Sequence, residues 1–100
     1  GIANKFDELQ ANIGHKKPRV RIIRMRRVPF IDSTGIHNLT TLIEMNHADG
    51  IHVILSGVSH KVHEQLRKAK FYELMEPDHI CPHIDIALEK AREVLAISVK

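Results

Sequence analysis

The chain has 100 residues, of which 43% are hydrophobic and 27% are charged, and its formal net charge is +3. This length fits one domain covering residues 1–100, and the composition is that of a globular protein, which excludes a disordered chain. No apolar run approaches the roughly 20 residues that cross a bilayer, and the amino end lacks the features of a signal peptide. We therefore expect a soluble domain.

The amino-terminal segment is predicted to be helical. Phe6, Leu9 and Ile13 recur at helical spacing. This pattern predicts a helix over Ala3 to Asn12, which Gly14 ends as a C-cap.

A strand and a second helix are predicted next. The β-branched run from Arg19 to Val28 predicts a strand, which ends before Pro29 because proline cannot donate to a sheet. Asp32 and Ser33 are good N-caps for the helix that follows, and Gly50 ends it. Its predicted apolar face consists of Ile36, Leu39, Leu42, Ile43 and Met45.

The carboxy-terminal half continues the alternation of strands and helices. Ile51 to Leu55 is a short apolar strand, and Ser59 is placed as the N-cap of a third helix. The segment from His79 to His83 is predicted as a short last strand at the edge of the sheet, because Pro82 interrupts it. Asp85 is predicted to cap the final helix. The order of elements indicates an α/β fold with a small, mostly parallel sheet and about four helices.

The most informative local pattern is the segment from Val28 to Gly35, where a strand enters a turn and the turn opens a helix. The free N–H groups at that helix start, with the positive end of the helix dipole, favour an anionic group. A phosphate added to Ser33 would lie at this position, and Gly35 permits close approach of another backbone or a ligand. The alternative is that Asp32 and Ser33 serve only as helix caps.

The segment Pro29 to Gly35, after an apolar strand and before a helix, resembles the signature loop of STAS domains. This family contains bacterial anti-sigma factor antagonists and the carboxy-terminal tails of SulP anion transporters. The similarity extends over nearly the whole chain, including the strand at Ile51 to Leu55 and the Ser56-Gly57 pair after it. In the antagonists a partner kinase phosphorylates the serine of the Asp-Ser motif, and the resemblance places that role on Ser33.

The amino end favours the transporter branch, because Gly1-Ile2-Ala3-Asn4-Lys5-Phe6 is similar to a segment of transporter tails. The resemblance implies a non-catalytic, cytoplasmic regulatory and protein-interaction domain, joined to the upstream membrane part of an anion transporter. The alternative is a free-standing anti-sigma factor antagonist that is regulated by phosphorylation at Ser33. No cofactor is expected, apart from weak nucleotide binding that the family implies. The residues predicted to carry interactions are Asp32, Ser33, Thr34 and Gly35, with Phe30 and His37 beside them.

The start of the chain departs from the family pattern, in which one or two strands precede the first helix. Without those strands, we expect a truncated sheet in which the strand from Arg19 to Met25 is an unpaired edge. Such an edge invites pairing with a second copy, so a homodimer through it is a further expectation, although the arginines discourage it.

Three further features suggest functions that we do not predict. Seven Lys or Arg residues lie between Lys16 and Arg27, and nucleic-acid binding through Arg19 to Arg27 is a third, weaker alternative. No aromatic residues alternate with these arginines, which argues against single-stranded nucleic acid. The pattern His79-x-Cys81-x-His83 places three metal-capable side chains on one face of an extended strand, yet no fourth ligand is apparent and no metal site is predicted. Catalysis is not expected either, because neither Cys81 nor Ser33 lies in a recognisable nucleophile motif.

Overall fold

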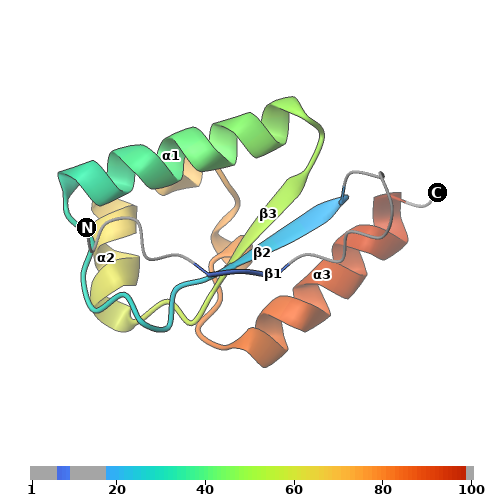
Figure 1. The fold of residues 1–100 in the computed structure, drawn as a ribbon. Coiled ribbons are helices and arrows are strands. Elements are labelled where there is room, and N and C mark those ends of the chain that lie inside the picture. Colours follow the sequence, from blue (N-terminus) through green and yellow to red (C-terminus); the bar gives the residue numbers. More distant parts are fainter. Residues whose placement is uncertain (1–6, 10–17, 99–100) are drawn as a thin grey trace.

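The structure is a computed structural model that describes residues 7–9 and 18–98. The elements follow one another as β1 (Asp7–Leu9), β2 (Val20–Arg24), α1 (Ser33–Ala48), β3 (His52–Ser56), α2 (His60–Lys68), the 3-10 helices η2 (Phe71–Glu73) and η3 (Pro77–His79), and α3 (Ile84–Ser98). Figure 1 shows the strands lying between α1 and α3, with α2 near the start of α1.

The three strands form one sheet in the order β1-β2-β3. β2 and β3 are parallel, and their register places Val20 opposite His52 and Arg24 opposite Ser56. A crossover through α1 connects them, as a parallel pair requires. The predicted α/β class is confirmed, with three α-helices among the described residues.

The amino-terminal prediction is wrong where it can be compared with the structure. Asp7–Leu9 is a strand, antiparallel to β2, and Glu8 lies opposite Ile23; the rest of the predicted helix over Ala3 to Asn12, and Gly14, fall outside the described residues. The backbone N–H and C=O groups along the edge of β2 need partners, and β1 supplies them over Ile22–Arg24. The edge of β2 is therefore paired at these residues, which removes the premise of the predicted dimer there.

The alternation of side chains in β2 and β3 divides the core into two parts. Ile23 and Leu55 point to one face of the sheet, where they pack with Leu39 and Ile43 of α1. Residues of the opposite parity point to the other face, where they pack against α3; this second cluster comprises Ile22, Ile54, Cys81, Ala87 and Ala91. Strands that are apolar on both faces are typical of a parallel sheet covered by helices on each side.

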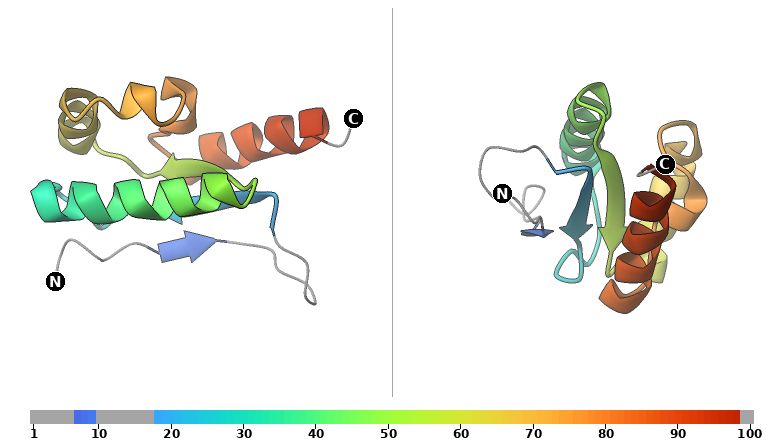
Figure 2. Two further views of the ribbon diagram at one scale, coloured as in Figure 1. Left: turned by 90° about the horizontal axis from the view of Figure 1, so that it is seen from above. Right: turned by 90° about the vertical axis from the view of Figure 1, so that its right-hand side faces the viewer.

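The helices accordingly form layers on either side of the sheet. Val62 and Leu66 of α2 belong to the same core cluster as α1, whereas α3 contacts β2 and β3 from the opposite face. Figure 2 shows α1 and α3 on opposite sides of the two parallel strands. This arrangement brings the loops at the carboxyl ends of β2 and β3 together at one end of the domain.

The end of β2 and the predicted last strand both differ from the sequence prediction. β2 ends at Arg24, not at Val28, because Met25 to Val28 forms a tight turn in which the Val28 N–H donates to the Met25 carbonyl oxygen at 3.0 Å. In the predicted last strand from His79 to His83, His79 belongs to η3 instead, and Ile80 makes an isolated parallel bridge to Leu55.

Two helix details also differ from the predictions. α3 begins at Ile84, so Asp85 lies in its first turn and is not its cap. On α1, Leu39 and Ile43 are fully buried, but Met45 is 62% exposed because the buried stripe continues through Asn46 instead. Asn46 accepts a hydrogen bond from Arg21 Nη1 at 2.8 Å, which lets a polar residue occupy this buried position.

Candidate functional site

The loop between β2 and α1 presents all but one of the predicted interaction residues at the surface. Asp32 is the N-cap of α1, and its Oδ1 accepts a hydrogen bond from the Gly35 N–H at 2.8 Å. This confirms the predicted capping role of Asp32, while Ser33 is the first residue of the helix. Asp32, Ser33 and Thr34 are exposed, and Gly35 is buried.

The position of Ser33 suits a negatively charged group. It lies in the first turn of a 16-residue helix, where the N–H groups lack intrahelical acceptors and the helix dipole is positive. No residue after the cap is acidic in this turn, and the Asp32 carboxylate that caps the helix is the neighbouring negative group. A phosphate on Ser33 would add about −1.5 to −2 charges at a position that stabilises them, and exposure leaves the hydroxyl accessible.

The loop is anchored to the domain by the residue before its cap. Ile31 is 3% exposed, and its N–H donates to Oε1 of Gln65, a residue of α2, at 2.8 Å. The side chain of Ile31 packs in the core while its backbone is tied to α2. Gln65 therefore fixes the point from which Asp32 and Ser33 project.

We expect the Gln65→Ala variant to lower the free energy of unfolding by roughly 1–2 kcal/mol, because the Ile31 N–H loses its acceptor in a partly buried environment. Amide hydrogen exchange at Ile31 should accelerate at the same time. Gln65→Glu is the matched control, since its carboxylate still accepts this bond. Equal exchange at Ile31 in both variants would show that Gln65 does not anchor the loop.

Phe30 and the start of α2 extend this surface. The Phe30 side chain is 41% exposed, and Lys61 Nζ lies 5.8 Å from the centre of its ring. A cation at this distance is attracted to the face of the ring. His37 is exposed one turn into α1. We name the surface formed by Phe30, Asp32, Ser33, Thr34 and His37 the α1 docking surface.

The basic segment does not form one continuous positive strip in the part that is described. Arg21 lies beside Asn46 of α1, whereas Arg24 lines a pocket beside the start of α3. Arg19 and Arg27 are exposed; Lys16 and Lys17 lie outside the described residues. The described arginines are thus divided between the two faces of the sheet.

The structure separates the three residues of the His79-x-Cys81-x-His83 pattern. Cys81 is 1% exposed within the core, and burial raises the pKa of its thiol, which does not suit a nucleophile. His79 and His83 line two different pockets. The predicted strand geometry that would have aligned them is replaced by η3 and one bridge.

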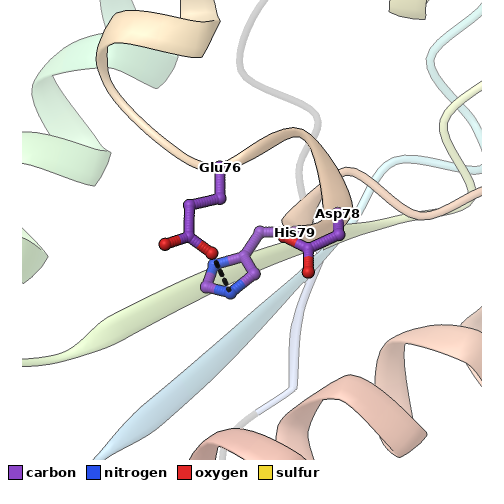
Figure 3. A group of neighbouring side chains, drawn as sticks. All are labelled: Glu76, Asp78 and His79. Carbon is purple, nitrogen blue, oxygen red and sulfur yellow. Dashed lines mark ion pairs between the residues drawn. The ribbon is translucent and has the colours of Figure 1, made fainter.

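A different group of metal-capable side chains lies at η3, and the sequence analysis missed it. Ligand atoms of Glu76, Asp78 and His79 lie within 4.8 Å of one another. Figure 3 shows the three side chains as neighbours. However, Lys90 Nζ lies 2.7 Å from Asp78 Oδ2 and lowers the pKa of that carboxyl group. Glu76 pairs with His79 at 3.8 Å. The group is thus balanced by a cation from α3, and we assign it no metal.

Comparison with known proteins identifies similar domains. A family model described as STAS domain matches residues 2–87. A sulfate transporter family protein from Wolinella succinogenes is 37% identical with a TM-score of 0.77, and the match covers 84% of this chain and 69% of that one. A SulP transporter STAS domain from Vibrio cholerae is 32% identical with a TM-score of 0.75, covering 86% of this chain and 66% of the other.

Two further findings complete the comparison. Among curated proteins, none matches this chain significantly. No helix in the described part of the chain has the length and apolar character needed to cross a membrane.

Proposed function

Because the chain belongs to the STAS domain family, we propose that it is the cytoplasmic regulatory domain of a SulP-type anion transporter, that it acts by binding proteins, and that it catalyses no reaction. The observation that carries this proposal is the likeness to two domains of that transporter class, at 37% and 32% identity. The fold resemblance alone would not separate transporter tails from other members of the family.

The α1 docking surface is the part of the domain proposed to contact partners. It combines an exposed aromatic ring, a helix N-terminus and polar side chains, and Ile31 and Gln65 fix it to the core. Exposed aromatic residues supply much of the binding energy at protein interfaces. The partners are proposed to be the membrane part of the same transporter and regulatory proteins.

We expect Ser33→Glu in the full-length transporter to change the rate of sulfate uptake into proteoliposomes. The new charge lies at the docking surface, whereas the helix N-terminus tolerates it and gains about 0.3–1 kcal/mol of stability. The isolated domain should therefore melt no lower than the unmodified one. A changed uptake rate with an intact domain is the expected result.

Thr41→Glu is the control for this experiment. Thr41 is exposed on the same helix, two turns beyond Ser33 and one turn beyond His37, so the variant adds the same charge beyond the residues that define the docking surface. Uptake should be unaffected by it. If Ser33→Glu and Thr41→Glu alter uptake equally, or neither does, the docking surface has no part in regulation.

A second function is favoured by the exposed position of Ser33 at the start of α1. A free-standing anti-sigma factor antagonist would be inactivated when a kinase phosphorylates this hydroxyl. Incubation with candidate kinases followed by mass spectrometry should then locate phosphate on Ser33, with Ser33→Ala as the blank. An unmodified Ser33 counts against the antagonist and leaves the transporter proposal intact.

A further inference from the structure

A pocket of about 380 Å³ lies on the opposite side of the sheet from α1, where α3 begins. Its polar lining comes from Arg24 and Arg26 at the end of β2, Ser56 at the end of β3, and His83 and Asp85 at the start of α3. Ligands of parallel α/β proteins commonly bind at the carboxyl ends of the strands. None of these residues belongs to the α1 docking surface.

The fold itself brings the arginines and the serine together. Arg24 and Ser56 are register partners in β2 and β3, and they share the parity of Ile22 and Ile54, which pack on the α3 side. The Met25 N–H donates to the Ser56 carbonyl oxygen at 2.7 Å, which joins the two strand ends.

Gly57 fixes the backbone from which Arg26 extends. A Cβ atom on Gly57 would lie 2.9 Å from the Arg26 backbone nitrogen, so the two loops are in direct contact. The Arg26 side chain itself is exposed and lines the pocket. The backbone of Arg26 thus packs against Gly57, and its cationic side chain contributes to the pocket lining.

Ser56 is the most informative residue of the pocket. The residue is 1% exposed, and it lines the pocket together with Arg24 and Arg26. The Ser56 hydroxyl and the two guanidinium groups can all donate hydrogen bonds, so a pocket lined by them suits an acceptor that carries several oxygens.

The start of α3 adds a second source of positive charge to the pocket. α3 has 15 residues, and Ile84 and Asp85 of its first turn line the pocket. The N–H groups at the start of a helix have no acceptor within the helix, so they are available to a ligand. The helix dipole makes this end positive. Asp85 is the acidic side chain in the lining, and it opposes the binding of an anion.

We propose that this pocket binds a small oxyanion, either free phosphate or sulfate or the terminal phosphate of an ester. Arg24 and Arg26 supply charge-assisted hydrogen bonds, Ser56 donates its hydroxyl proton, and the first turn of α3 provides the positive end of a dipole. The site consists only of described residues of this domain. The proposal that it binds an anion does not depend on the regulatory role proposed above.

The test is a titration of the ¹⁵N-labelled chain with inorganic phosphate, inorganic sulfate and a phosphate monoester such as adenosine monophosphate, each followed by amide chemical shifts. Saturable shifts are expected at Gly57 and in the first turn of α3. Tighter binding of the inorganic ions assigns the pocket to a free anion, and tighter binding of the monoester assigns it to an ester phosphate. Sodium chloride at matched ionic strength should not reproduce the shifts.

Neighbouring arginines provide a matched pair of variants. Arg26→Gln should weaken binding about tenfold, because one charge-assisted hydrogen bond is lost, whereas Arg27→Gln, exposed in the same turn but outside the pocket, should leave it unchanged. Ser56→Ala should also weaken binding, and Asp85→Asn should strengthen it. Circular dichroism verifies that each variant is folded. The proposal is overturned if no saturable shifts appear, if they map to Asp32–Gly35, or if both arginine variants bind alike.

Discussion

Leu39→Ala should lower the free energy of unfolding by about 3 kcal/mol. Leu39 is fully buried between α1 and the sheet, and it belongs to the core cluster that contains Ile23 and Leu55. Truncating a buried leucine removes its transfer free energy and leaves a cavity, and such changes typically cost roughly 2–5 kcal/mol. For a domain of this size that is a large share of a total of about 5–15 kcal/mol. Urea unfolding followed by circular dichroism measures the effect.

Met45→Ala is the matched control on the same helix. Met45 is 62% exposed, so its truncation should change the free energy of unfolding by less than about 0.5 kcal/mol. The sequence placed both residues on one apolar face, and the structure separates them. Similar losses in the two variants would contradict the orientation of α1, and with it the outward position of the α1 docking surface.

Gly57→Ala should destabilise the domain by roughly 2–3 kcal/mol, for two reasons that add. The φ angle of Gly57 is +71°, a left-handed conformation that costs a residue with a side chain about 1–2 kcal/mol. The added Cβ would also lie 2.9 Å from backbone and side-chain atoms of Arg26, so the turn after β2 must shift. Thermal and urea unfolding both report the loss.

Gly50→Ala separates the two causes. Gly50 has a φ angle of +74°, and a Cβ placed on it meets nothing within 4 Å. This variant should therefore lose only the conformational part, about 1 kcal/mol. The difference between the two variants measures the close contact between the loops after β2 and β3. If Gly57→Ala costs no more than Gly50→Ala, that contact does not exist in solution.

The sequence predicted those parts of the fold that depend on local patterns. The apolar runs of β2 and β3 and the caps Asp32 and Ser59 were located correctly, since capping is decided within four residues. The amino end was wrong at Asp7–Leu9, because a short apolar spacing cannot reveal that the edge of β2 lies nearby and needs hydrogen-bond partners. The turn at Met25 to Val28 was missed because β-branched and apolar residues continue through it.

The candidate site likewise has parts that the sequence predicted and parts that it did not. The exposed start of α1 was predicted from Asp32 and Ser33, whose position depends only on the helix they begin. The anchor between Ile31 and Gln65 joins residues 34 apart in the sequence, so it appears only when α2 is packed. The anion pocket combines the ends of two strands with the start of α3, and no local motif connects those segments.

The regulatory role depends on one physical statement: this domain is part of a larger membrane transporter and presents the start of α1 to its partners. Fractionation of cells that express the native protein, followed by immunoblotting with an antibody against this domain, tests the statement most directly. The account predicts a signal in the membrane fraction, on a polypeptide several times larger than these 100 residues. A band of about this domain's own size in the soluble fraction would contradict it and favour a free-standing antagonist.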